Sequence, residues 1–270
     1  MNPSTDCYYY KQITLNNRKN ILTNVAILLT MNNKTEEDEN IKQIIDKVPS
    51  KRLFIQFNKG FQNCDKKHLI KQQSNYDLCD ATKTALLYAF EDLNEEHVLI
   101  LEDDAYFVKS FEKDIPQIKS FVKKSDYLVY NLGAGGFIAN PFTIIFNKKH
   151  IHVNTYSLSH ACVYNKRILK RFDMKKCKHV DLYSIYLDNC YVYHKPLVLQ
   201  FLQKHSSNSN TWPIAGKFGF YLMNKLGLFK EYPPLVEDFN KLYFFSKLCS
   251  VLFLMTLLYI IIHGILNIHV

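Results

Sequence analysis

Near the middle of this chain, four aliphatic residues run directly into three carboxylates. The apolar run is Val98–Leu101, and Glu102, Asp103 and Asp104 follow it without a break. A short apolar run of this kind predicts a buried strand, and in open α/β sheets the ligand crevice lies outside the carboxyl ends of such strands. Adjacent carboxylates repel one another unless a cation joins them, and Mg²⁺ and Mn²⁺ prefer oxygen ligands. The pattern therefore predicts a metal–phosphate site, with a solvated acidic turn as the alternative.

The segments before this run alternate between strand-like and helix-like patterns. Asn24–Thr30 and Arg52–Phe57 are apolar runs of strand length, and the helix-forming segment Thr35–Lys47 lies between them. Asp77–Asn94 then places apolar residues at helical spacing and leads into the acidic strand. This order predicts βαβ units and a mostly parallel sheet. Residues 1–22 are polar and tyrosine-rich, which predicts an N-terminal extension.

The later segments continue the same alternation. They predict helices at Phe107–Lys123, Lys166–Phe172 and Asp181–Leu187, and strands at Tyr127–Leu132, Phe142–Phe146, His152–Tyr156, His160–Tyr164 and within Tyr191–Gln203. The glycine-rich segment 133–136 matches neither nucleotide-binding glycine motif, so it predicts a turn or a close backbone approach rather than a phosphate cradle. The expected fold is α/β, with one Rossmann-type domain at residues 23–212.

A long apolar stretch ends the chain. Leu248–Ile268 contains no charged residue and would be about 31 Å long as a helix. This length predicts a single-pass transmembrane helix, with a helix packed inside the protein as the alternative. Lysines precede the stretch and none follows it, which predicts residues 1–245 on the cytosolic face of the membrane. Residues 213–247 predict an amphipathic juxtamembrane region that lies on the membrane or docks onto the domain.

Composition narrows the classes of partner and compartment. The net charge of +9 suits a polyanionic substrate or an anionic membrane surface. No nucleic-acid-binding signature accompanies this charge, so no nucleic acid is expected as a partner. Seven cysteines without a CxxC pair predict reduced thiols rather than a zinc site or a complete disulfide framework. The N-terminus lacks the basic and apolar regions of a secretory signal.

Three blocks, taken together and in order, resemble the glycosyltransferases of family 25, which include lipopolysaccharide and collagen galactosyltransferases. Leu99–Ala105 resembles the strand-terminal acidic motif of that family. Asn154–Arg171 resembles its block of small residue, strand and helix, and His179–Leu182 resembles its acceptor-side Val-Asp. The resemblance covers about residues 24–212 and is strongest to divergent forms from large DNA viruses. The first strand of the family has two candidate equivalents here, Ile13–Leu15 and Val25–Leu29.

The resemblance implies a GT-A-like fold and a metal-dependent transfer of a hexose from a nucleotide sugar, with a UDP-sugar favoured. The acceptor would be a hydroxyl of a glycan, a lipid or a protein. Asp104 and Glu102 would then ligate Mn²⁺ or Mg²⁺, because the metal neutralises the charge that builds on the leaving diphosphate. Asp103 would hold hydroxyls of the donor.

Four further residues complete the predicted site. Asp181 would be the general base that accepts the proton of the acceptor hydroxyl, although it could instead cap the following helix. His205 would be a further metal ligand or a solvent-facing side chain. Asn58 and Lys59 follow the second predicted strand and would meet the nucleotide, or form a solvated turn.

Two other classes of protein fit part of this pattern. A nucleotidyl- or phosphotransferase also needs clustered acids at the end of a strand. A non-catalytic membrane-anchored adaptor could retain a decayed transferase fold. Both alternatives stay open at the level of sequence, because the acidic cluster alone does not identify the reaction.

Overall fold

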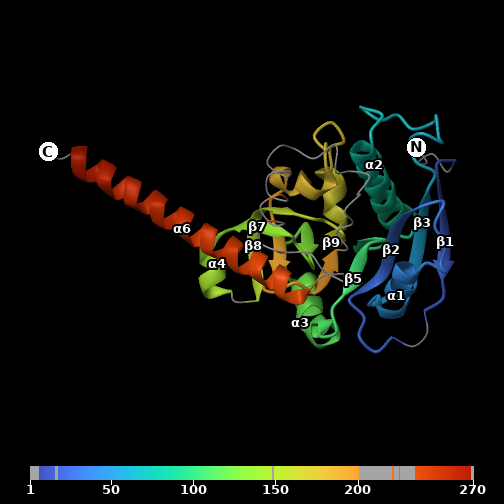
Figure 1. Cartoon of the computed structure of the whole chain (residues 1–270), viewed down its shortest axis with the longest axis horizontal. Helices are drawn as coiled ribbons and strands as arrows, with labels where there is room; N and C mark the ends of the chain where they lie inside the picture. Colours follow the sequence, from blue (N-terminus) through green and yellow to red (C-terminus); the bar gives the residue numbers. More distant parts are fainter. Residues whose placement is uncertain are drawn as a thin grey trace.

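The protein is described from a computed structural model, which covers residues 6–15, 18–147, 149–200, 221, 225 and 235–268 (Figure 1). Within these residues the main sheet has nine strands, and their order across the sheet is β1 (Tyr8–Ile13), β3 (Ser50–Asn58), β2 (Thr23–Met31), β4 (His97–Glu102), β9 (Ala161–Asn165), β6 (Val129–Asn131), β10 (Cys190–Tyr193), β8 (His150–Ser157) and β7 (Gly136–Ala139). Six strands run in one direction, and β1, β9 and β8 run in the other. The predicted α/β class with a mostly parallel sheet is confirmed.

Helices and a second small sheet surround this main sheet. The second sheet pairs β5 (Ala105–Phe107) with β11 (Val198–Gln200). The described helices are α1 (Glu39–Lys47), α2 (Ser74–Leu87) with the π-helical turn η1 (Tyr88–Asp92), α3 (Phe111–Lys124), α4 (Pro141–Phe146), the 3₁₀ turns η2 (Lys166–Lys170) and η3 (Val180–Tyr186), and α6 (Val236–Ile268).

The central strands are buried on both faces, as their apolar runs predict. Val98 and Ile100 of β4 belong to the core that includes α2, whereas Leu99 and Leu101 belong to the core that includes α1 and α3. Side chains alternate between the two faces of a sheet along a strand, so one apolar run supplies both cores. This arrangement fixes β4 in the middle of the domain and brings its acidic end to the edge of the sheet.

The N-terminal segment belongs to the sheet instead of forming an extension outside it. Tyr8–Ile13 forms β1, which pairs antiparallel with β3 at the edge of the sheet. Val25–Leu29 lies in β2, which is flanked by β3 and β4 in parallel register. Of the two candidates for the first strand of the βαβ series, the structure therefore places Val25–Leu29 in the central position.

The prediction of reduced thiols is wrong for four of the seven cysteines. One disulfide joins Cys7 to Cys64, and a second joins Cys79 of α2 to Cys177, which precedes η3. The paired cysteines are separated by 57 and 98 residues, respectively. Separations this long leave no local pattern in the sequence, so the pairing becomes visible only in the folded chain.

The prediction of a strand at Phe142–Phe146 is also wrong, because these residues form α4. The side chain of Asn140 accepts a hydrogen bond of 3.0 Å from the backbone N–H of Phe142, and Pro141 occupies the first turn. An Asn cap followed by proline favours the start of a helix. These two residues outweigh the strand propensity of the aromatic and β-branched residues that follow.

Helix α6 is attached to the domain through the edge strand β7. Three hydroxyls of the helix accept hydrogen bonds from backbone N–H groups at or just before this strand: Tyr243 from Ala134 at 3.1 Å, Ser246 from Phe137 at 3.1 Å and Ser250 from Ala139 at 2.9 Å. An edge strand has one row of N–H groups without a strand partner, and these side chains satisfy part of that row. The first part of α6 is therefore a fixed component of the domain.

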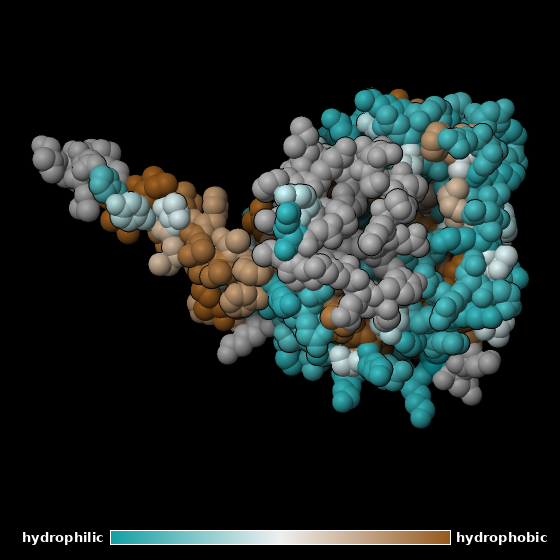
Figure 2. All heavy atoms as spheres, in the orientation of Figure 1, coloured by the Kyte–Doolittle hydropathy of each residue, from teal (hydrophilic) through white to brown (hydrophobic). Residues whose placement is uncertain are grey.

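Beyond Ser250 the helix leaves the domain, and its exposed side chains are mainly apolar as far as Ile262 (Figures 1 and 2). The helix is long and apolar enough to cross a membrane: within residues 236–263, the most apolar 18-residue window has a mean hydropathy of 2.2, and only 6% of that window is buried. The C-terminal apolar helix is thus present as predicted, although it begins at Val236 instead of Leu248. The exposed part of α6 therefore does not fit the alternative prediction of a helix packed inside the domain.

Candidate functional site

The acidic residues lie at the carboxyl end of β4, beside the carboxyl end of β2. Glu102 is the last residue of β4 and is in register with Leu29 of β2. Just past that point, the hydroxyl of Thr30 donates a hydrogen bond of 2.6 Å to Asp103 Oδ2. Lys34 Nζ lies 3.0 Å from the same oxygen. Asp103 is therefore oriented by two side chains from the end of the neighbouring strand.

Asp104 faces the small sheet. Its Oδ2 accepts a hydrogen bond of 2.9 Å from the side-chain amide of Gln200, which lies on β11. Its Oδ1 is buried and has no hydrogen-bond partner among the described residues. Burial raises the pKa of Asp104 to about 7, and the negative charge of Asp103 adds to this effect. A carboxylate in this position is stabilised by any cation that reaches it.

Asp181 belongs to the same cluster, although it is far away in the sequence. Its Oδ1 accepts hydrogen bonds of 2.9 Å from both the backbone N–H and the hydroxyl of Ser159. The backbone carbonyl of His160, the residue after Ser159, accepts a hydrogen bond of 2.9 Å from the backbone N–H of Glu102. Burial raises the pKa of Glu102 well above its usual range, and the charges of Asp104 and Asp181 raise it further. The fold thus brings four carboxylates into one site.

The hydrogen bonds of Asp181 differ from those of a helix cap, the alternative role predicted for this residue. The residue that caps η3 by position is His179, and no side chain caps that turn. Asp181 instead uses its carboxylate to bind Ser159. It is half-buried, so its side chain is held by the domain while part of it remains open to a ligand.

His160 is fully buried beside the cluster. Its Nε2 lies 3.1 Å from the carbonyl oxygen of Val198, and because a carbonyl only accepts, Nε2 carries the proton. Nδ1 is then an acceptor, and it is buried without a partner. Burial lowers the pKa of His160 to about 4, so the ring is neutral at physiological pH.

The glycine-rich segment lets the backbone approach this histidine. A Cβ atom on Gly133 would lie 1.7 Å from the carbonyl oxygen of Val198 and 2.9 Å from His160 Nε2. Side chains do not tolerate such distances, so only glycine fits here. The predicted close backbone approach is confirmed at Gly133.

We expect Gly133→Ala to destabilise the domain by more than about 2 kcal/mol, because the added methyl group must displace the backbone of β11. Gly136→Ala is the matched control. Its Cβ would meet Ser157 and Ser246 at 3.7 Å, which is ordinary contact, so its effect should stay below about 1 kcal/mol. Urea unfolding of the full chain in detergent measures both variants, and equal losses would contradict this account of Gly133.

Within the part of the chain that the structure describes, three buried polar atoms around the cluster lack hydrogen-bond partners. They are Asp104 Oδ1, Gln200 Oε1 and His160 Nδ1. All three can accept hydrogen bonds, and their side chains are linked to one short strand, because Asp104 binds Gln200 and His160 binds Val198, two residues earlier in β11. Buried polar atoms are normally satisfied. These three acceptors, one of which belongs to the Asp104 carboxylate itself, fit a cation or a ligand rich in donors.

The donor set suits a metal that is held partly by its ligand. Among the described residues, no group of three or more His, Cys, Asp and Glu side chains is arranged to hold a metal ion. Mg²⁺ and Mn²⁺ commonly bind through one or two carboxylates together with phosphates of a substrate. Asp104 with its free Oδ1 fits such a ligand, and Glu102 lies next to it in the cluster.

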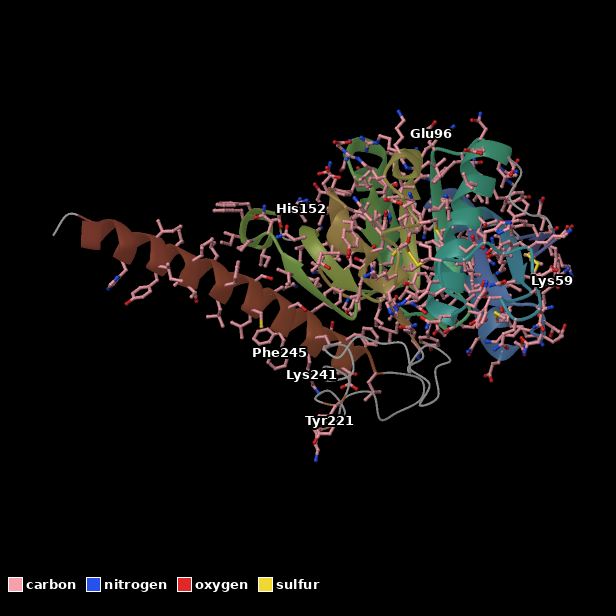
Figure 3. The ribbon with its side chains drawn as sticks, turned by 90° about the horizontal axis from the view of Figure 1, so that it is seen from above. Lys59, Glu96, His152, Tyr221, Lys241 and Phe245 are labelled. Carbon is pink, nitrogen blue, oxygen red and sulfur yellow. A yellow bond between two sulfur atoms is a disulfide. The ribbon has the colours of Figure 1, made fainter. Side chains whose placement is uncertain are left out.

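The remaining predicted residues lie elsewhere. Asn58 belongs to a buried network, in which its side-chain oxygen accepts from Lys67 Nζ at 2.6 Å and its amide donates to Asp77 at 3.1 Å. Lys59 donates its backbone N–H to Cys7 and lies at the end of the domain far from α6 (Figure 3). His205 lies outside the described residues. No contact joins the described residues Asn58 and Lys59 to the acidic cluster.

Sequence reasoning did not select the side chains that orient the acids. Thr30 lies near the end of β2 and Lys34 follows that strand, whereas Ser159 lies just before β9 and Gln200 lies in β11. A usable signal existed for the first pair, because the carboxyl ends of parallel neighbours meet at one edge of a sheet. No such rule places Ser159 or Gln200.

The sequence matches no protein-family model and no curated protein. Among solved structures, A197 from STIV aligns with 64% of this chain and 82% of its own length, at 10% identity and a TM-score of 0.40. A glycosyltransferase involved in the glycosylation of the major capsid of PBCV-1 aligns with 68% of this chain and 94% of its own length, at 12% identity and a TM-score of 0.35. Because neither TM-score reaches 0.5, we take the function from the residues of the site.

Proposed function

We propose that this protein is a membrane-anchored, metal-dependent glycosyltransferase that uses a nucleotide sugar, with a UDP-sugar favoured as the donor. The observation that carries the proposal is the acidic cluster of Glu102, Asp103, Asp104 and Asp181, with its unsatisfied buried acceptors, at the carboxyl ends of the parallel strands. Ligands of open α/β sheets bind at this edge. A metal–diphosphate group supplies the positive charge that the cluster lacks.

In this proposal, Asp104 holds Mn²⁺ or Mg²⁺ with Glu102 beside it. The metal, when bound, neutralises the charge that develops on the leaving diphosphate. Asp103 binds hydroxyls of the donor, because Thr30 and Lys34 hold its carboxylate in place. Lys34 is 37% exposed at its side chain, so it can also contact a phosphate oxygen of the donor.

Asp181 is the proposed general base. Both of its hydrogen bonds from Ser159 go to Oδ1, which fixes the carboxylate and leaves Oδ2 to accept a proton. In an inverting transfer, the acceptor oxygen bonds to the anomeric carbon while its proton moves to Asp181 and the nucleoside diphosphate leaves. Ser159 is then a positioning residue for this base.

Helix α6 is the proposed single-pass anchor, and it keeps the site near the membrane. Tyr243 contacts Ala134, the neighbour of Gly133 at the site. Val251, the first residue beyond the contacts with β7, lies eight residues further along, or about 12 Å. An acceptor hydroxyl on a membrane lipid, or on a glycan or protein at the membrane surface, therefore fits the reach of the site.

Product analysis tests the proposed reaction. The full chain in detergent is incubated with UDP-, GDP- and CMP-sugars that carry a label in the sugar, with and without Mn²⁺. We expect Mn²⁺-dependent release of labelled sugar, or its transfer to an added acceptor, from one donor class. Transfer of the nucleotide or of a phosphate would identify the alternative enzyme class, and no turnover or binding of any donor would favour the adaptor.

The orientation of the domain is a separate prediction. The lysines before the span favour a cytosolic domain, whereas disulfides are typical of oxidising compartments. Asn33 is exposed and begins the sequon Asn33-Lys34-Thr35. With a cytosolic domain, full-length protein from animal cells should show no change in mobility after N-glycosidase treatment. A shift that Asn33→Gln removes would place the domain in the lumen.

A further inference from the structure

The end of the domain from which α6 emerges carries an exposed apolar group on α4 (Figure 1). Phe142, Ile145 and Phe146 are 58%, 53% and 80% exposed, respectively. Ile138, on the adjoining strand β7, is 53% exposed. We call these four residues the α4 tip. Exposed apolar groups of this kind on a small helix mark a surface that is covered in the working protein.

The α4 tip lies where α6 leaves the domain (Figures 1 and 3). Ser250 of α6 accepts the N–H of Ala139, and Asn140, the cap of α4, is the next residue. Helix α4 also packs directly against α6. The tip therefore lies beside the exposed apolar part of α6, which runs from Phe244 to Ile262.

The surrounding charges match a membrane surface. Residues 127–147 contain no charged side chain, and Lys148 and Lys149 follow them immediately. Apolar side chains flanked by lysines are typical of segments that enter the boundary between headgroups and acyl chains. The inner end of α4 is fixed, because Thr143 hydrogen-bonds to the backbone of His152 and Ile144 packs against the core. The exposed side chains are thus presented by a rigid support.

We propose that the α4 tip inserts into the lipid bilayer beside α6 and forms a second membrane contact of the domain. The occupant of this surface is lipid, since the tip is continuous with the candidate span. Two contacts side by side restrict rotation of the domain about the axis of α6 and hold the site at one orientation to the membrane. This inference rests on the proposed anchor, and it is independent of the reaction that the site performs.

Single tryptophan probes test the insertion. The chain has one tryptophan, Trp212, which is replaced by phenylalanine to give a silent background. Phe146→Trp reports on the tip and Tyr259→Trp reports on α6. Ile185→Trp on η3 is the control, because Ile185 is also exposed, at 64%, but it lies on a different element. The full chain is reconstituted into vesicles whose phospholipids carry bromine near the top of the acyl chains.

The bromine should quench the probe at residue 146 at least about twofold more than the probe at residue 185. Equal, weak quenching at residues 146 and 185, with strong quenching at residue 259, would overturn the inference while the anchor stands. Weak quenching at all three positions would overturn the anchor itself. A blue-shifted probe at residue 146 that depends on protein concentration and not on bromine would assign the tip to a protein contact instead.

Discussion

Asp104→Asn is expected to reduce Mn²⁺-dependent turnover of the donor by at least about 100-fold. The substitution keeps the size of the side chain and its contact with Gln200 while it removes the charge that would hold the metal. The same change should raise the melting temperature in the absence of metal, because it removes a buried charge next to Asp103 and Asp181. Lost activity together with gained stability separates a functional role from a folding defect.

Asp188→Asn is the matched control for this experiment. Asp188 is exposed at the surface, and its ion pair with Arg171 has an N–O distance of 3.7 Å. Its replacement should leave both turnover and melting temperature unchanged. Unchanged turnover in the Asp104→Asn protein would remove Asp104 from the metal site. A lower melting temperature in that variant would mean that the charge serves the fold.

Lys67→Met is expected to destabilise the domain by about 3–5 kcal/mol. The side chain of Lys67 is fully buried and pairs with Asp77, and it also donates to Asn58 at 2.6 Å and to the hydroxyl of Tyr8 at 2.8 Å. Burial lowers the pKa of Lys67, whereas its pairing with Asp77 acts in the opposite direction. Removal of the lysine leaves Asp77 buried without its cation.

Urea unfolding under non-reducing conditions measures this effect, and Lys66→Met provides the comparison. Lys66 also pairs with an aspartate, Asp6, but both side chains are exposed, so the midpoint should not move. The double variant Lys67→Met/Asp77→Leu should recover part of the loss, because it removes both charges together. A loss below about 1 kcal/mol in Lys67→Met would show that the network is not a main support of the β1, β3 and α2 packing.

The position of the acidic cluster could be predicted because it depends on local sequence. The apolar run of β4 marks a strand buried on both faces, and the acids that follow it must lie at the edge of the sheet. Asp181 could be assigned to the site only because the sequence around it resembles a motif of a glycosyltransferase family. Its contact with Ser159 joins residues that are 22 positions apart, and no periodicity in the sequence predicts such a contact.

The predictions that failed concern interactions between distant residues or competing local signals. The disulfides join residues whose spacing shows no pattern, and β1 pairs with β3 across an intervening strand and helix. The donor-binding role predicted for Asn58 stays a prediction, and in the structure its side-chain amide group binds Lys67 and Asp77. The strand propensity at Phe142–Phe146 was countered by a cap in the preceding residues, which the sequence did contain.

The measurement that tests the account most directly is calorimetric titration of the full chain in detergent with UDP, in the presence and absence of Mn²⁺. We expect binding that requires Mn²⁺, that Asp104→Asn abolishes and that Asp188→Asn retains. GDP and CDP are titrated in the same way to include the other donor classes. Binding of none of these diphosphates, or binding that is unaffected by both Mn²⁺ and Asp104→Asn, would contradict a metal–diphosphate site at the end of β4.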